Sequence, residues 1–251
     1  MDENQNQNEE HLKKFDDTYF KRAAYANVSF KKYSQYWWSN RYYSGLAKKY
    51  GPKSGRVLEV GTGMGDLLGW FDPQVYEVYG TDINPWAVEQ AQKNVPAGQF
   101  MILNAEDLSH FEDNYFQIVV SKHVVEHLQN PEKSIDEMCR VLAPGGLLLL
   151  ATPNMDSPMR TYKKDKWIGY QDPTHISLKT PAIWLGYIKA NHLTIRKAYS
   201  DGFWDAPYVP LIPKMIQKLI FGGPGGFQAI LGWSIIPIWL GESLITIASK
   251  P

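Results

Sequence analysis

The sequence predicts an α/β protein built on a doubly wound, mostly parallel sheet of seven strands. Two observations predict this class: short apolar stretches alternate with helical patterns, and the first stretch runs into a loop with glycine at every second position. Strands that alternate with helices are joined by crossovers, which produce parallel sheets. The expected strands are residues 56–60, 75–81, 99–103, 116–121, 147–152, 193–199 and 243–249.

The bulk composition is that of one neutral domain. A chain of 251 residues with 44% hydrophobic content is large enough for a single core. The 26 basic and 26 acidic residues create no net field, so no nucleic-acid partner is expected. The single cysteine, Cys139, cannot form an internal disulfide, which is typical of a reducing compartment. We therefore expect a cytoplasmic protein.

The chain begins with a polar segment. Residues 1–15 open with Asn, Gln and Glu and lack the apolar core of a signal peptide, so we expect a disordered tail. One domain is expected to follow over residues 16–251. The best candidate for a membrane span, residues 227–240, is interrupted by Gly232, Ser234 and Pro237, and no transmembrane segment is expected.

Residues 28–50 show a helical pattern that is crowded with aromatic side chains and ends before Gly51-Pro52. We expect this helix to lie across a ligand pocket. Packing onto the sheet explains most of its aromatic residues, and whether any of them touches a ligand stays open. A further helix is expected over residues 180–191.

The loop after the first strand is the strongest functional signal. Glycine at 61, 63 and 65 lets a ligand approach the bare backbone, and Asp82, at the end of the second strand, can accept the hydroxyls of a ribose. A dinucleotide fingerprint requires glycine at the sixth position, where this chain has Asp66. Asp66 would repel a pyrophosphate, and Glu59 suits an ammonium-bearing ligand. The pattern favours S-adenosylmethionine over a nicotinamide dinucleotide.

Five segments in order resemble the motifs of class I S-adenosylmethionine-dependent methyltransferases. They begin at the glycine loop and continue through residues 79–84, 103–108, 116–121 and 141–146; Gln117 stands where that family usually has an acid. The resemblance implies a Rossmann-like fold whose last strand is antiparallel. It also implies the cofactor-binding residues Glu59, Gly61, Thr62, Gly63, Gly65, Asp82, Ile83, Asn104, Ala105, Glu106 and Lys122.

Candidate catalytic residues follow the fourth strand. His123, Glu126 and His127 have the spacing of one face of a helical turn, and His175 stands in a distant loop. The pattern resembles the Glu-x-x-Glu-His and distant His of metal-assisted O-methyltransferases, with His123 in place of the first Glu. That replacement disfavours magnesium, and no metal ligand is assigned. A metal-free base, structural histidines, a contact of His123 with cofactor or acceptor, and a divalent metal all stay open.

Residues 203–241 form an insertion that the family pattern does not explain. Apolar residues recur at helical spacing from 211 to 220, and the sequence Gly-Gly-Pro-Gly-Gly at 222–226 then predicts a flexible break. Packing on the core, a lid over an apolar acceptor, and a peripheral membrane or dimer contact through residues 211–240 are the competing interpretations.

The sequence thus predicts a methyltransferase that uses S-adenosylmethionine to methylate a hydroxyl of a small or lipid-linked compound. Two alternatives are a nicotinamide-dependent oxidoreductase or epimerase, and a non-catalytic protein that only binds S-adenosylmethionine. The oligomeric state is not predicted.

Overall fold

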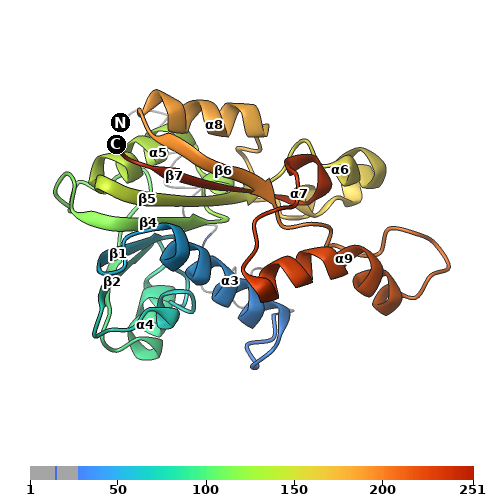
Figure 1. Ribbon diagram of the computed structural model, residues 1–251, viewed down its shortest axis with the longest axis horizontal. Helices are drawn as coiled ribbons and strands as arrows, with labels where there is room; N and C mark the ends of the chain where they lie inside the picture. Colours follow the sequence, from blue (N-terminus) through green and yellow to red (C-terminus); the bar gives the residue numbers. More distant parts are fainter. Residues whose placement is uncertain (1–14, 16–27) are drawn as a thin grey trace.

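A seven-stranded sheet runs through the part of the chain that the computed structural model describes, namely residue 15 and residues 28–251. The strand order is β3-β2-β1-β4-β5-β7-β6, and only β7 runs antiparallel to its neighbours. The strands are β1 Gly55–Val60, β2 Tyr76–Asp82, β3 Gln99–Ile102, β4 Phe116–Lys122, β5 Leu142–Pro153, β6 Thr194–Ser200 and β7 Ser243–Ser249 (Figure 1). The predicted doubly wound sheet with an antiparallel last strand is confirmed.

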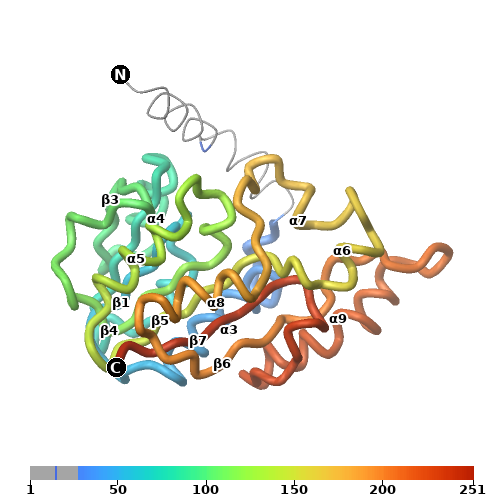
Figure 2. Tube along the Cα trace, turned by 90° about the horizontal axis from the view of Figure 1, so that it is seen from above, coloured from blue at the N-terminus to red at the C-terminus, as the bar shows by residue number. Residues whose placement is uncertain are grey.

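Helices cover both faces of the sheet. The α-helices are α3 Gln35–Tyr50, α4 Pro85–Asn94, α5 Pro131–Val141, α6 Pro158–Lys163, α7 Ile168–Gln171, α8 Pro181–Ala190 and α9 Lys214–Leu231. Short 3₁₀ turns are η2 Leu68–Trp70, η3 Val125–His127, η4 Lys164–Lys166 and η5 Ile238–Leu240. Helices α5 and α8 pack on one face, and α3 packs on the other (Figure 1). Figure 2 shows α6, α7 and α9 gathered at one end of the molecule.

Side chains on the two faces of each central strand belong to two separate apolar clusters, one on each side of the sheet. In β1, Val57 packs toward the α3 side and Leu58 toward the α5 and α8 side, and both are fully buried. Burial on both faces is what parallel strands between two helix layers require. It also holds the strand register, because a one-residue slip would exchange the two side-chain sets.

The strand order reverses direction between β1 and β4. These two strands pair in parallel, and the chain leaves them toward opposite edges of the sheet. Ligands of open α/β sheets bind in the crevice that such a reversal leaves at the carboxyl ends of the strands. The loops after β1, β2 and β4 therefore mark the expected site.

Helix α3 begins seven residues later than the predicted helix. The hydroxyl of Ser34 accepts a hydrogen bond from the Trp37 backbone N–H at 3.1 Å, which caps the helix, and Tyr33 before it has a positive φ of 68°. The cap satisfies one of the exposed N–H groups of the first turn, and the left-handed Tyr33 ends any helical path from residue 28. The carboxyl end agrees with the prediction at Tyr50.

The predicted break in the insertion is wrong: α9 continues without interruption from Lys214 to Leu231, with Pro224 inside it. The glycines allow close packing here instead of a turn. A Cβ atom on Gly225 would lie 2.2 Å from the carbonyl oxygen of Asp201. Pro224 removes one helical hydrogen bond, and contacts to the rest of the protein outweigh that loss.

Two buried glutamines attach α9 to the body of the protein. Gln217 bonds the backbone of the preceding loop, accepting from the Val209 N–H at 2.9 Å and donating to the Val209 oxygen at 2.7 Å. Gln228 donates to the Ser200 oxygen at 2.8 Å and accepts from the backbone N–H groups of Ile235 and Ile236. The inward side of α9 is therefore polar.

The opposite side of α9 is apolar and faces outward. We call it the α9 apolar face: Met215, Ile216, Leu219, Ile220, Phe227, Ile230 and Leu231, which are 47 to 75% exposed. The sequence predicted an amphipathic helix here, and the structure shows that Gln217 on its polar side is buried while its apolar residues are exposed. None of the helices in the described ranges combines the length and apolar character needed to cross a membrane.

Of the predicted disordered tail, residues 1–14 lie outside the described part of the chain, as do residues 16–27. Phe15, the last residue of that tail, packs edge-on against the His127 ring at 5.5 Å, and its carbonyl accepts a hydrogen bond from Asn84. Phe15 therefore belongs to the surroundings of the site.

Candidate active site

A cavity of about 1380 Å³ opens at the carboxyl ends of β1, β2 and β4. Ligand pockets of roughly 300–1000 Å³ are usual, so this one has room for a nucleoside cofactor together with an acceptor. Its walls come from α3, the loops after β1, β2, β3 and β4, the loop that carries His175, and α9. Every predicted cofactor residue except Gly65 lines it.

The glycine loop is shaped as the sequence predicted. Gly61 and Gly63 have φ values of +72° and +54°, and the N–H groups of Gly61 and Thr62 both donate to the Thr81 oxygen at 2.8 Å. A Cβ atom on Gly61 would lie 2.2 Å from a methyl group of Val124. Both backbone conformation and space therefore exclude a side chain at position 61. Gly65 faces α4 instead, where its Cβ would meet Ala91.

Asp82 joins this loop to the start of α4. One oxygen of its buried carboxyl group accepts from the Gly63 N–H at 2.9 Å, and the other accepts from the Asn84 N–H at 3.0 Å. Burial raises its pKa, while the backbone hydrogen bonds favour the ionised form. The carboxyl group is thus fixed at the edge of the cavity, where it can also accept hydroxyl groups.

Three charged groups meet beneath the loop. Burial raises the pKa of Glu59, whose carboxyl group accepts from the Thr62 hydroxyl at 2.9 Å, and burial lowers the pKa of Lys122. Burial also raises the pKa of Asp66, which accepts a hydrogen bond from the Tyr36 hydroxyl at 3.1 Å. The positive charge of Lys122 offsets part of the desolvation cost of burying the carboxyl groups of Glu59 and Asp66.

Helix α3 contributes polar and aromatic side chains to this cluster. The Lys122 ammonium donates to Asn40 at 2.8 Å and lies 5.3 and 5.2 Å from the ring centres of Tyr36 and Tyr43. Four aromatic residues of the helix line the cavity: Tyr36, Trp38, Tyr42 and Tyr43. The sequence alone left open whether these aromatic residues line the pocket, and Asn40 was not predicted to do so. The position of Asn40, a polar residue among the aromatic residues of this helix, could have indicated that it faces the pocket.

Asn104, Ala105 and Glu106 line the cavity after β3. The Asn104 side chain accepts from the Glu106 N–H at 2.9 Å. Both oxygens of Glu106 accept from Asn130, one from its backbone and one from its side chain, each at 2.9 Å. Glu106 therefore ties two loops together.

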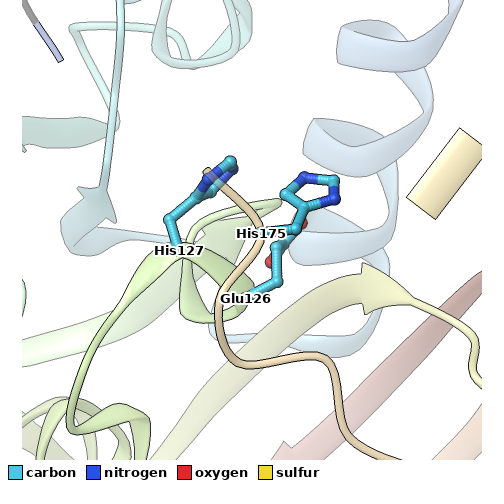
Figure 3. A group of neighbouring side chains, drawn as sticks. All are labelled: Glu126, His127 and His175. Carbon is cyan, nitrogen blue, oxygen red and sulfur yellow. The ribbon is translucent and has the colours of Figure 1, made fainter. Parts of the chain in front are cut away.

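The predicted helical face of His123, Glu126 and His127 does not form. His123 has a positive φ of 55°, and the 3₁₀ turn begins only at Val125. The left-handed backbone separates His123 from the turn, although its Nδ1 still lies 3.1 Å from a Glu126 oxygen. Ligand atoms of Glu126, His127 and His175 lie within 4.8 Å of one another, and His123 is not part of that group. Figure 3 shows these three side chains, from the turn after β4 and from the loop of His175.

The two grouped imidazoles have distinct partners. Nδ1 of His127 lies 2.9 Å from the Thr174 hydroxyl, which donates its proton to Asp172. Nδ1 of His175 lies 2.7 Å from the Gly169 carbonyl oxygen. The ring centres are 4.6 Å apart. Both histidines were predicted from the sequence, whereas no role was predicted for Asp172 or Thr174, which stand three positions and one position before His175.

Glu126 is fully buried beneath the histidines. Burial alone would raise its pKa, and the hydrogen bond from His123 together with the nearby imidazoles brings the pKa below its usual value. Its other oxygen accepts from the Thr152 hydroxyl at 3.2 Å. Two imidazoles and a carboxylate are donors that a borderline divalent cation such as zinc accepts more readily than magnesium does.

The groups around the glycine loop match the needs of S-adenosylmethionine. Asp82 can accept hydroxyls of a ribose, bare backbone at Gly61 and Gly63 allows close approach, and the acidic Glu59 complements an ammonium group. A pyrophosphate would instead meet Asp66 and Glu59. The residues present therefore fit an adenosyl sulfonium better than a dinucleotide.

Comparison with known proteins agrees with this fit. A profile of the methyltransferase domain family matches residues 32–196. The chain is 30% identical over 159 residues to the uncharacterized methyltransferase YcgJ of Bacillus subtilis, which covers 61% of each chain. It is 36% identical over 106 residues to the ubiquinone/menaquinone biosynthesis C-methyltransferase UbiE of Neisseria meningitidis, over 39% of this chain and 42% of that protein. The matches thus span about two fifths to three fifths of these relatives.

Solved structures share the fold. The crystal structure of Bacillus subtilis YcgJ superimposes with a TM-score of 0.59 at 21% identity, over 83% of this chain and 97% of that one. Geranyl diphosphate C-methyltransferase from Streptomyces coelicolor, in complex with S-adenosyl-L-homocysteine, superimposes with a TM-score of 0.58 at 12% identity, over 83% and 77% of the two chains. With the profile match over residues 32–196, the chain belongs to the methyltransferase domain family.

Proposed function

We propose that this enzyme methylates a hydroxyl oxygen of a small or lipid-linked acceptor, with His127 as a metal-free general base. When bound, S-adenosylmethionine supplies an electrophilic methyl group. The acceptor oxygen forms a bond to the methyl carbon as the carbon–sulfur bond breaks, and the hydroxyl proton passes to Nε2 of His127. The other product is S-adenosylhomocysteine.

The single observation that carries this proposal is the hydrogen-bond order Asp172, Thr174, His127. A carboxylate only accepts, so the one hydroxyl proton of Thr174 is directed to Asp172. The Thr174 oxygen can then only accept from the Nδ1–H of His127. The lone pair of the neutral imidazole is consequently on Nε2. This arrangement sets the tautomer that a base needs.

The surroundings keep His127 neutral. Burial lowers its pKa below the ordinary value, against the opposing charges of Glu126 and Asp172. An unprotonated imidazole is thus available at neutral pH. His175, whose Nδ1–H donates to the Gly169 carbonyl, carries its own lone pair on Nε2 and supports the same part of the cavity.

The shape of the cavity supports an acceptor that is partly apolar. Beyond the cofactor residues, its walls include Trp38, Leu103, Ile168, Trp204 and Ile230. Such walls exclude water from a displacement reaction and favour a phenolic, quinone-like, sugar or lipid-linked compound over a highly charged one. The relatives named as C-methyltransferases make carbon the competing acceptor atom.

The acceptor can be identified by incubating the enzyme with S-adenosylmethionine labelled in its methyl group and a fractionated cell extract. We expect label in a small-molecule or lipid fraction, in a methyl ether. Label on carbon, on nitrogen or in a macromolecule would contradict the proposed acceptor class.

Thr174 is proposed as a positioning residue, and its replacement tests the hydrogen-bond order. Thr174→Val should lower turnover at least about tenfold, because the imidazole loses the partner that sets its tautomer. In the wild type the rate should fall as pH drops through the His127 pKa, which burial holds below the ordinary value of a histidine. In Thr174→Val this acid limb should move to still lower pH, because the imidazolium loses its link to Asp172.

Thr174→Ser is the matched control, since it keeps the hydroxyl group and should retain the wild-type pH profile. An unchanged profile in Thr174→Val, or equal losses in both variants, would contradict the proposed role.

A divalent cation held by Glu126, His127 and His175 is the second candidate, favoured by their spacing within 4.8 Å. Metal analysis of the purified protein and activity after chelation separate the two. Full activity without bound metal supports the base, whereas loss on chelation and recovery with one added metal would replace it.

A further inference from the structure

We propose that the α9 apolar face lies on an anionic bilayer surface and holds the acceptor side of the cavity against it. The delivery of a lipid-linked acceptor by this route rests on the proposed function. The bilayer contact itself does not, because it follows from the surface of α9.

The seven side chains form one continuous face. At 100° per residue, they occupy an arc of about 160° around α9, while Gln217 and Gln228 lie on the opposite side. Exposed fractions of 47 to 75% leave most of this apolar area in water. A soluble surface rarely keeps such a patch without a function.

Packing of the protein core does not account for this face. Hydrogen bonds from Gln217 and Gln228 already attach the inward side of α9. Their buried amide groups bond to backbone groups, which offsets the free-energy cost of removing the amides from water. The apolar residues are therefore not needed to hold the helix in place. An interfacial helix, by contrast, places its apolar side into the boundary between headgroups and acyl chains.

The local charge fits an anionic surface. Residues 206–241 contain Lys214 and Lys218 and no acidic residue, although the whole chain is neutral. Both lysines are exposed, on the side of α9 away from the apolar arc. The basic groups beside the apolar face come from α3: Arg41 donates to the Ile230 oxygen at 3.5 Å, and the exposed Lys49 donates to the Gly232 oxygen at 2.9 Å. Their long side chains can reach lipid phosphates. Attraction to a membrane would thus be confined to this side of the molecule.

A second copy of the chain fits this face less well. A symmetric dimer would bring the same patch of two chains together, with Arg41 and Lys49 of both chains at its edge and no acid in residues 206–241 to neutralise them. Anionic lipids supply that neutralising charge. The bilayer is therefore the occupant that the charge pattern favours.

The apolar face is continuous with the cavity. Ile230 is half-exposed and belongs to the face, and it also lines the cavity. The same helix also lines the cavity with three residues that lack side chains: Gly222, Gly225 and Gly226. A bilayer against α9 would therefore lie next to the cavity, on the side away from the glycine loop.

Flotation with lipid vesicles tests the contact. We expect the wild type to bind vesicles containing phosphatidylglycerol and to bind pure phosphatidylcholine vesicles weakly. The double variant L219S/F227S should lose at least about tenfold in partition coefficient, because two large apolar side chains no longer enter the interface. Lys49→Gln should lose about fivefold on phosphatidylglycerol only, because Lys49 lies beside the end of the apolar face.

Matched controls lie on α8, which has an exposed Ile183 and Lys189. Ile183→Ser and Lys189→Gln should bind vesicles as the wild type does. Unchanged circular dichroism and S-adenosylhomocysteine affinity in L219S/F227S would show that its fold and cofactor end are intact. These readouts are independent of acceptor turnover, so failure of the bilayer contact is distinguishable from failure of the proposed function.

Three results would overturn the proposal. One is no binding by the wild type to either vesicle, and another is equal loss in the α8 controls. The third is a concentration-dependent dimer in light scattering that L219S/F227S abolishes, which would assign the face to a second copy.

Discussion

The cofactor end and the acceptor end of the cavity are built in different ways. At the cofactor end, strands of the central sheet carry the groups directly: the buried Asp82 ends β2, and the half-buried Lys122 ends β4. At the acceptor end, α9 is attached through the side-chain amides of Gln217 and Gln228 and keeps its apolar side outside. The first end is part of the core, whereas the second is an attachment to it.

This difference separates binding of the cofactor from turnover of the acceptor. Changes at the sheet ends should alter cofactor affinity, and changes at the histidine loop or at α9 should alter what happens to the acceptor. The following variants test that separation, beginning with the largest expected effect.

His127→Ala should reduce turnover by about 10²- to 10⁴-fold, because the acceptor proton loses its base. Cofactor affinity should stay close to that of the wild type, since the cofactor residues lie on other loops. Single-turnover kinetics and calorimetry with S-adenosylhomocysteine measure the two quantities. Equal losses in both would show that the two ends are not separable.

Asp82→Ala should weaken cofactor binding by about 1–3 kcal/mol, through the loss of charge-assisted hydrogen bonds and of the link to Gly63. Asp82→Asn is the matched control, which keeps the side-chain shape and removes the charge. Calorimetry that finds wild-type affinity in both variants would remove Asp82 from its proposed role.

Gln228→Ala should loosen α9, because the Ser200 carbonyl and two backbone N–H groups lose their partner at a cost of about 1–3 kcal/mol. Hydrogen exchange should accelerate in α9 and not in β1 or β4. Cofactor affinity should remain unchanged. Faster exchange in the central strands would mean that α9 is part of the same cooperative unit as the sheet.

The family assignment removes the nicotinamide-dependent alternative that the sequence left open. The order of five motifs was enough to predict the fold and cofactor class, because each motif depends on neighbours close in the chain. Strand length, apolar runs and the glycine loop are all local properties. Boundaries were less accurate: the predicted start of α3 was too early because the Ser34 cap depends on one side-chain hydrogen bond.

The catalytic loop was only partly predictable. His127 and His175 were identified as residues of the right type, and their meeting required a loop forty-eight positions away to fold over η3. The helical spacing assigned to His123 failed because one left-handed residue breaks the periodicity. Thr174 and Asp172 gained a role only through their distance to His127.

By itself, the sequence determined the seven-strand sheet, the glycine loop and the position of Asp82, because strands and tight turns follow from residues near one another in the chain. Tertiary structure alone decided that α9 continues through Gly-Gly-Pro-Gly-Gly and that its glutamines face inward. Those outcomes depend on backbone groups of Asp201, Val209 and Ser200, which reach α9 only after the chain has folded. A glycine run permits either a turn or a close contact, and only the neighbouring backbone selects between them.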